Sequence, residues 1–249
     1  MIIRPIKTRK FLPPKDDLWD LISSSITALE EESVVVITSK IVSISEGRCV
    51  KSGSVGKDEL AKREAEFYLP RNEVPGKWLM HTLTKNQLIA SAGIDKSNGG
   101  SFFILWPKNP QRSAKKIWGF LRKKYSVKTI GVVITDSHTV PLHRGLVGMC
   151  IGYFGFEPLR DYRGKKDIFG EELKMSQTNI PDSLASAAVF EMGEGNEQTP
   201  LAVISNLDSK IKFTGEGPAT EKYNSFEVPV KEDLFYPFLK SVKWKRGKD

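Results

Sequence analysis

Three stretches of the sequence place polar side chains directly after an apolar run: "VVVITSK", "LIASAGIDKSN" and "TIGVVITDS". The polar residues at these run ends are Ser39, Lys40, Asp95, Ser97, Asp136 and Ser137. Aspartates with neighbouring hydroxyls, and no cysteine or histidine cluster, suit a hard divalent ion such as Mg²⁺ or Mn²⁺. Such an ion neutralises phosphate charge, and a lysine beside it suits a phosphate contact. The pattern is compatible with metal-dependent phosphate chemistry, but by spacing alone the better interpretation of Asp95 and Asp136 is that they form ordinary turns.

The segment after Asp136 adds further polar groups. "SHTVPLHRG" contains His138, His143 and Arg144, which could contact a substrate or a phosphate, whereas His81 in an alternating strand is expected to be structural. The sequence has no G-x-x-x-x-G-K-[ST] and no G-x-G-x-x-G between a strand and a helix, so a nucleotide would be bound without a P-loop. A serine hydrolase is disfavoured because there is no G-x-S-x-G.

The elements that position these residues follow from the apolar periodicity. Helices are expected from near residue 16 as far as Leu29, over 57–69, over 109–125 with Asn109 as the cap, and over 181–192. Strands are expected over 33–38 with 39–48 continuing from it, 77–83 paired with 87–93, 101–106, 129–135, 146–155 and 200–204. Helices and strands do not alternate strictly, so the fold class is α+β, a mixed α/β arrangement with mixed sheets. Strand ends that face one edge of an open sheet commonly form a site, so we expect the three polar run ends to converge.

Composition limits the class of partner. The net charge is +8, and much of the excess lies in 112–128 and in the C-terminal tail. A basic surface can attract phosphorylated small molecules or RNA, or can simply be a solvated helix face. No zinc-finger spacing, RNP-like aromatic motif or arginine-glycine repeat is present, so nucleic acid is not the expected partner.

The location follows from the same composition. Cys49 and Cys150 have no metal-ligand spacing, which favours a reduced, cytoplasmic protein. No apolar run approaches the roughly 20 residues of a membrane helix, and the first residues do not resemble a secretory signal. We therefore expect no membrane partner.

Six ordered blocks between about residue 34 and residue 204 resemble a known family. The blocks are "VVVITSKIVSISEGR", "SAGIDKSN", "WPKNPQRSAKKI", "ITDSHTVP", "IGYFGFEPLRDYRGKKDIFGEEL" and "DSLASAAVFEMGEG". They are similar to the motifs of the coenzyme F420-0:L-glutamate ligase family, which adds γ-linked glutamate to a deazaflavin cofactor precursor. A chance match across six blocks in the same order is not a reasonable explanation.

The resemblance implies an acid–amino-acid ligase that uses GTP, or ATP, with Mg²⁺ or Mn²⁺ and with K⁺ as a further candidate ion. The acceptor carboxylate would become an acyl phosphate that the amine of L-glutamate attacks. The implied fold is a mixed α/β structure that forms an intertwined homodimer with its site near the subunit interface. Residues 1–204 would form the catalytic domain, and residues 205–249 a C-terminal extension or arm.

The resemblance also implies roles for single residues. Asp95 and Asp136 match metal-ligand aspartates, Ser137 takes the place of a threonine, and Glu194 in "MGEG" matches a further ligand. Ser39 and Lys40 match a strand-end pair close to the phosphates, and Lys40 and Asp136 are the expected catalytic residues. Substrate or nucleotide binding is expected from Ser39, Lys40, Ser97, His138, His143 and Arg144.

The sequence departs from the family pattern just after Asp136. Val140 and His143 stand where the family has arginines, Leu142 stands in place of its tryptophan, and 146–148 read Leu-Val-Gly in place of Gln-Thr-Asp. Losing two bidentate anion contacts predicts an acceptor with less negative charge, although Arg144 could restore one contact. A folate-like pterin acceptor would fit this change. A changed nucleotide, or a family member that binds nucleotide without ligating, are the alternatives.

Overall fold

The chain forms two compact units in the computed structural model, which describes residues 1–207, 210–215 and 226–248. Unit 1 contains Met1–Arg9, Trp19–Thr38 and Asn109–Phe226, and unit 2 contains Lys10–Leu18, Ser39–Lys108 and Glu227–Asp249. The expected catalytic domain over 1–204 with an extension over 205–249 stays a prediction. Within that extension, residues 208–209, 216–225 and 249 lie outside the described residues.

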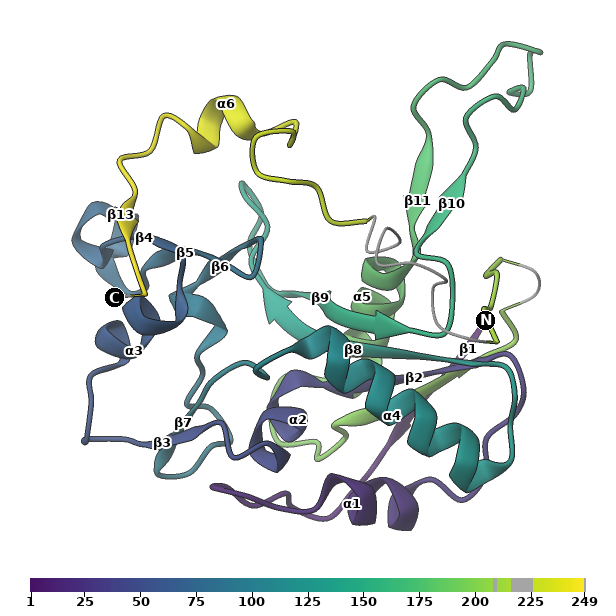
Figure 1. The fold of residues 1–249 in the computed structure, drawn as a ribbon, viewed down its shortest axis with the longest axis horizontal. Coiled ribbons are helices and arrows are strands. Elements are labelled where there is room, and N and C mark those ends of the chain that lie inside the picture. The colour runs from purple at the N-terminus through teal and green to yellow at the C-terminus, as the bar shows by residue number, and fades with distance from the viewer. Residues whose placement is uncertain (208–209, 216–225, 249) are drawn as a thin grey trace. The chain divides into compact units, whose positions relative to one another are not determined.

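Unit 1 is built on a five-stranded mixed sheet with the order β1-β12-β2-β8-β9 (Figure 1). Its strands are β1 (Ile2–Ile6), β2 (Ser33–Thr38), β8 (Ile130–His138), β9 (Val147–Phe154) and β12 (Leu201–Ser205). β2 and β8 are parallel, and the other neighbours are antiparallel. The central strands are apolar over 34–37 of β2 and 130–134 of β8, where both faces of the sheet are covered.

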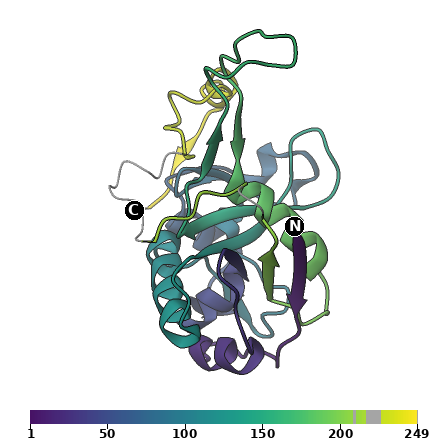
Figure 2. The ribbon, with the colours of Figure 1, turned by 90° about the vertical axis from the view of Figure 1, so that its right-hand side faces the viewer.

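Helices cover both faces of this sheet. α4 (Pro110–Tyr125) covers one face and α5 (Ile180–Met192) covers the other, as the two views of the ribbon show (Figures 1 and 2). α1 (Leu18–Ser25) packs beside α4, where the Trp19 and Phe120 rings lie 4.8 Å apart. The predicted cap is confirmed, because the Asn109 side chain accepts a hydrogen bond from the Arg112 amide at 2.9 Å and Pro110 opens the helix.

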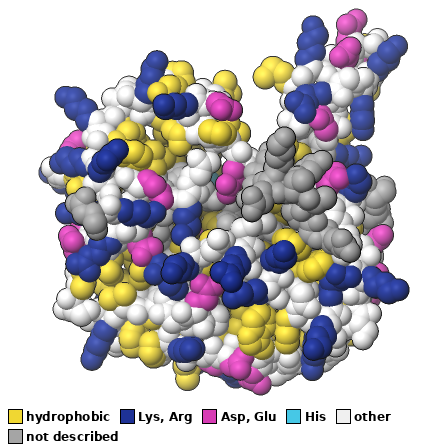
Figure 3. Space-filling view, viewed as in Figure 1, with side chains coloured by type: hydrophobic (Ala, Val, Ile, Leu, Met, Phe, Trp, Pro, Cys, Tyr) yellow, Lys and Arg dark blue, Asp and Glu magenta, His cyan; other side chains and the backbone are white. Residues whose placement is uncertain are grey.

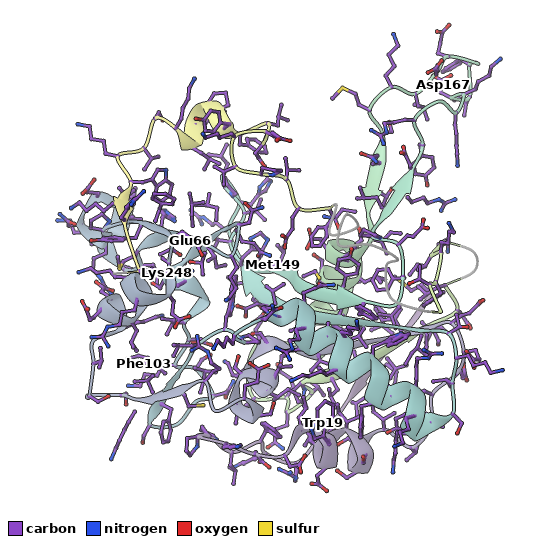
Figure 4. All side chains as sticks on the ribbon, viewed as in Figure 1. Trp19, Glu66, Phe103, Met149, Asp167 and Lys248 are labelled. Atoms are coloured by element: carbon purple, nitrogen blue, oxygen red, sulfur yellow. The ribbon has the colours of Figure 1, made fainter. Side chains whose placement is uncertain are left out.

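A two-stranded arm extends from unit 1. It consists of β10 (Leu159–Asp161), β11 (Gln177–Asn179) and the loop between them, with Asp167 at the far end (Figure 4). The Asp167 carboxylate accepts hydrogen bonds from the Phe169 and Glu171 amides and so orders the loop. Ile168 and Phe169 are nevertheless 92% and 85% exposed. The arm therefore presents apolar side chains that unit 1 does not bury, among the charged side chains that Figure 3 shows along it.

Unit 2 combines two small antiparallel sheets with short helices. The first sheet has the order β13-β4-β5-β6, from Lys245–Arg246, Phe67–Leu69, His81–Thr84 and Gln87–Ala90, and the second pairs β3 (Cys49–Lys51) with β7 (Phe102–Ile104). The helices are α2 (Ser39–Ser45), α3 (Lys57–Glu64) and α6 (Tyr236–Leu239), with 3₁₀ turns over 71–73, 75–77 and 91–93. Their core is formed by Leu60, Ala61, Ala65, Met80, Ala92, Ile94 and Leu105. β13, the last strand, pairs antiparallel with β4, and an ion pair joins Lys248 to Glu66 (Figure 4).

The α+β class predicted from the sequence is confirmed, but several local predictions are wrong. The strands expected over 77–83 and 87–93 are shorter than expected, since β5 begins at His81 and 91–93 is a 3₁₀ turn. Residues 39–48 do not continue the strand, since Ser39–Ser45 is α2. Ile41, Val42 and Ile44 are buried together there, and this packing overrides the strand preference of β-branched residues.

The helix expected as far as Leu29 is α1, which ends at Ser25. The Ser24 hydroxyl donates to the carbonyls of Asp20 and Leu21 in the last turn, and such side-chain bonds to the backbone compete with continuation of a helix. The helix expected over 57–69 ends at Glu64, and 67–69 form β4 instead.

Candidate functional site

Two of the three apolar runs lie side by side in the large sheet. β2 and β8 run parallel with Thr38 beside Thr135, so Asp136 follows at the edge where β2 ends. The third run is not part of this sheet, which corrects the expectation of one shared edge. It forms β6, which pairs with β5 through a two-residue turn in which Lys85 and Asn86 both have positive φ. That turn folds β6 back into the small sheet of unit 2.

Unit 2 brings Lys40, Asp95 and Ser97 together, although Lys40 is 55 residues from Asp95 in the sequence. The Lys40 Nζ atom lies 2.6 Å from Asp95 Oδ2, 2.7 Å from the Ser97 carbonyl oxygen and 3.0 Å from Ser97 Oγ. Lys40 is positioned by α2 and is half-buried, whereas Asp95 and Ser97 lie in the loop after β6. Ser39 opens α2 and is buried. These three oxygens surround the ammonium group of Lys40.

The Asp95 carboxylate is held by its own turn. Its Oδ1 atom accepts the backbone amides of Lys96 and Ser97 at 2.6 and 2.9 Å, and the Ser97 hydroxyl donates to Oδ2. Partial burial opposes ionisation of Asp95, but the charge and hydrogen bond of Lys40, together with the Ser97 donors, lower the pKa from 3.8 to about 2. Asp95 is therefore ionised throughout the neutral range.

A second lysine near Asp95 was missed by sequence reasoning. Lys57 begins α3 and is half-buried, and this burial lowers the pKa of its ammonium group while the charge of Asp95 opposes the shift. The neighbouring Asp58 carboxylate is engaged by Arg71, whose Nε and Nη2 atoms both donate to it. No motif or spacing in the sequence marks Lys57, because its proximity to Asp95 arises only from the fold of unit 2.

Unit 1 brings Ser137 and Glu194 together. The Ser137 hydroxyl donates to Glu194 Oε1 at 2.6 Å, and Glu194 lies just after Gly193, which ends α5. Asp136 precedes Ser137 in β8, is half-buried, and pairs in register with Met149 of β9 (Figure 4). Unit 1 thus brings the Glu194 carboxylate to the Ser137 hydroxyl at the end of β8, next to Asp136 in the sequence. The convergence of this group with the unit 2 group stays a prediction.

The two histidines of this region differ in environment. Burial lowers the pKa of His138 below 6.5, and the carboxylate of Asp182 opposes the shift, so His138 is mainly neutral at pH 7. Asp182 itself accepts the Cys150 amide at 2.8 Å. His143 is exposed, and its ring Nδ1 lies 3.2 Å from the Pro141 carbonyl oxygen. Arg144 is also exposed, so His143 and Arg144 are accessible to a ligand from the β8–β9 loop.

Comparison with known proteins decides the family. The sequence model described as F420-0:Gamma-glutamyl ligase matches residues 6–206, which is most of the chain. The chain belongs to this family. Its expected enzyme class, an acid–amino-acid ligase, is the class of the family.

Curated relatives match this chain over most of its length and over most of their own. The coenzyme F420:L-glutamate ligase of Methanopyrus kandleri is 33% identical over 234 aligned positions, covering 87% of this chain and 90% of the relative. Proteins of the same name from Archaeoglobus fulgidus and Methanocaldococcus jannaschii are 32% and 33% identical, covering 91% and 83% of this chain and 94% and 86% of their own. The similarity therefore runs through both units.

Within this family framework, the donor atoms suit a hard divalent ion that shares its coordination with substrate. Among the residues that the structure describes, no three His, Cys, Asp or Glu side chains gather closely enough to hold a metal ion by themselves. Mg²⁺ at nucleotide sites is, however, usually held by one or two carboxylates together with phosphate oxygens. Ser137 and Glu194 supply hard oxygen donors in contact with each other, and Asp136 is the neighbouring residue on β8, so these residues are the candidates for such a site.

The β8–β9 loop exposes aliphatic side chains, in contrast to the polar residues at the end of β8. Leu142 is fully exposed, and Leu146 and Val147 are 53% and 39% exposed. The loop that departs from the family motif therefore presents aliphatic side chains next to His143 and Arg144. An acceptor that lies against it would meet an apolar surface with one fixed positive charge.

A membrane-spanning helix is not found in the described part of the chain, since none of its helices combines the necessary length with apolar character.

Proposed function

We propose that the chain is a ligase that joins L-glutamate through a γ-glutamyl amide bond to a cofactor-type carboxylate acceptor, using a nucleoside triphosphate and a divalent metal. Membership of the F420-0:gamma-glutamyl ligase family carries this proposal. The relatives are named for coenzyme F420 and L-glutamate, so F420-0 is the first acceptor to consider. A cytoplasmic location, predicted from the sequence, belongs to the same proposal.

The proposed reaction has two steps. An oxygen of the acceptor carboxylate attacks the γ-phosphorus of GTP or ATP, which gives an acyl phosphate and releases the nucleoside diphosphate. The amine of glutamate then attacks the acyl carbon, the amide forms, phosphate leaves and the amine loses a proton. Both steps depend on alignment of the reactants and on compensation of phosphate charge, because the phosphoryl group itself does little covalent chemistry with the protein.

The residues have distinct proposed roles. Lys40, whose ammonium group Asp95 and Ser97 hold in the absence of ligands, would contact phosphate oxygens. Asp136, Ser137 and Glu194 would hold Mg²⁺ or Mn²⁺, which when bound neutralises phosphate charge. Ser39 at the start of α2 is proposed to lie near the phosphates. His138, being mainly neutral, would act as a hydrogen-bonding group and not as a fixed charge.

The exposed aliphatic loop favours a second candidate acceptor. F420-0 carries a phosphodiester, whereas a folate lacks this charge and offers a carboxylate that glutamate can extend. With Leu142 and Leu146 exposed and only Arg144 charged, the loop suits the less anionic acceptor. We therefore propose folate-type pterins as the alternative acceptor within the same chemistry.

Product mass is the direct test of this proposal. Purified protein is incubated with Mn²⁺, L-glutamate, GTP or ATP, and F420-0 or a folate, and the acceptor is then weighed by mass spectrometry. We expect the acceptor to gain one glutamyl unit, with no gain when nucleotide or metal is omitted. No gain with either acceptor, while nucleotide remains bound, would contradict the proposal and support a family member that no longer ligates.

The chain is further proposed to act as a homodimer that uses the arm of unit 1. Phe169→Ser should weaken self-association by roughly tenfold, since truncation of a central interface aromatic typically has at least this effect. Phe190→Ser is the matched control, because Phe190 is equally exposed at 85% but lies on α5. Light scattering over a dilution series measures the mass. Equal behaviour of the two variants would exclude the arm as the dimer contact.

A further inference from the structure

The ammonium group of Lys40 occupies a cage of oxygen atoms. All three oxygens come from the loop after β6: Asp95 Oδ2, the Ser97 carbonyl and Ser97 Oγ, at 2.6, 2.7 and 3.0 Å from Nζ. An ammonium group has three N–H donors, so these contacts use its whole hydrogen-bonding capacity. A carboxylate, a carbonyl and a hydroxyl are also the donors that bind hard metal cations.

The cage is built by contacts that do not involve Lys40. Two backbone amides hold Asp95 Oδ1, and the Ser97 hydroxyl is anchored on Oδ2. The Asp95 backbone exchanges both hydrogen bonds with Ile104 of β7, at 3.0 and 2.8 Å, and the Gly99 amide donates to the Lys96 carbonyl. The oxygens would therefore keep their arrangement if the lysine side chain left, because the turn and β7 fix them.

We propose that Lys40 and the divalent metal compete for this cage, so that metal entry displaces the lysine and releases its ammonium group toward phosphate. The inference rests on the proposed metal dependence of the ligase. It explains why a residue expected to bind metal, Asp95, is paired with a lysine expected to bind phosphate. In this proposal Lys40 and Asp95 stay paired until metal and substrate bind.

The competition follows from charge and geometry. An ammonium group and a divalent cation cannot share one carboxylate oxygen and the same two neighbouring oxygens, since like charges at such a separation repel strongly. The lysine stem has four rotatable bonds and the side chain is only partly buried, so the ammonium group can leave without unfolding α2.

Metal binding without substrate tests the inference. Mn²⁺ binding is measured by electron paramagnetic resonance on the full-length Asp136→Asn/Glu194→Gln protein, so that the unit 1 carboxylates do not contribute. Adding Lys40→Met should raise Mn²⁺ affinity about tenfold, equivalent to about 1.4 kcal/mol. Lys96→Met is the matched control, because it removes one charge from the same loop and leaves the cage contacts unchanged. Lys40→Gln repeats the test if the methionine variant folds poorly.

Each outcome is decisive. A gain for Lys40→Met and Lys40→Gln but not for Lys96→Met, abolished by further Asp95→Asn, supports competition. Unchanged or lower affinity, an equal gain in Lys96→Met, undetectable Mn²⁺ binding, or binding that survives Asp95→Asn overturns it. The measurement contains no nucleotide, glutamate or acceptor, so failure of the proposed ligase activity would leave this result intact. Conversely, an active ligase without the affinity gain would refute only the competition.

Discussion

Asp136→Asn is expected to lower kcat/KM of the ligase reaction by roughly 10³-fold, at the upper end of the effect of removing one electrostatic group from a catalytic site. Asparagine has the same shape but no charge, so it would bind a divalent ion much less tightly. Asp136 lies at the half-buried end of β8, where its backbone is held by Met149 of β9. The folded structure should therefore persist while nucleotide binding in the presence of Mn²⁺ is lost.

Asp161→Asn provides the matched control for this prediction. Asp161 lies on β10 in the same unit, is exposed, and pairs with Arg163. It undergoes the same chemical change at a distance from the polar strand end, and its activity should stay within about twofold of the unaltered protein, as is usual for exposed surface positions. Calorimetric titration with GTP and Mn²⁺ reports binding, and product mass reports turnover. Normal binding in Asp136→Asn would remove this residue from the metal assignment.

Four of the five strands of the large sheet of unit 1 could be predicted from the sequence because their signals are local, whereas β1 was not predicted. The run "TIGVVIT" is apolar between its two threonines, as is typical of a strand covered on both faces, and the helix after Asn109 carries both a cap and a regular apolar face. α2 could not be predicted this way. Its serines and β-branched residues favour a strand locally, and only the burial of Ile41 and Ile44 in the folded chain selects the helix.

The sequence predicts which residues belong to the candidate site better than it predicts which of them contact one another. The sequence singles out Lys40, Asp95 and Ser97, and the fold of unit 2 brings all three within hydrogen-bonding distance. The sequence gives no reason, however, to expect that all three hydrogen bonds of the Lys40 ammonium group go to two residues of a single turn. Lys57 carries no sequence signal at all, because its position near Asp95 depends on how α3 packs over the short strands. Long-range geometry of this kind is set by tertiary packing.

The resemblance supplied what local chemistry could not. Glu194 lies in a glycine-containing turn that carries no weight by itself, yet its carboxylate accepts the Ser137 hydroxyl at 2.6 Å. The same resemblance exposed the altered loop, whose aliphatic side chains the structure leaves in solvent. Family membership thus limits the class of reaction, whereas the choice of acceptor belongs to the proposal that the altered loop motivates.

The largest expected loss of stability is at Gly155, immediately after β9. Gly155 has φ +94°, and a Cβ there would lie 2.2 Å from the Ile130 carbonyl oxygen and 2.6 Å from Trp118 Nε1. These two atoms form a buried hydrogen bond of 2.9 Å that joins α4 to β8. Gly155→Ala should therefore lower the free energy of unfolding by about 4 kcal/mol, from overpacking, the broken buried bond and the left-handed backbone.

Gly145→Ala separates crowding from backbone strain in this prediction. Gly145 has φ +95°, nearly the same as Gly155, but no atom lies within 4 Å of a Cβ built there. Its alanine variant should lose only about 1 kcal/mol, which is the cost of the left-handed conformation alone. Urea unfolding of both variants gives the two free energies. Equal losses would mean that φ alone requires glycine after β9, whereas the expected gap of about 3 kcal/mol would assign the requirement to the Trp118–Ile130 contact that fixes α4 on the sheet.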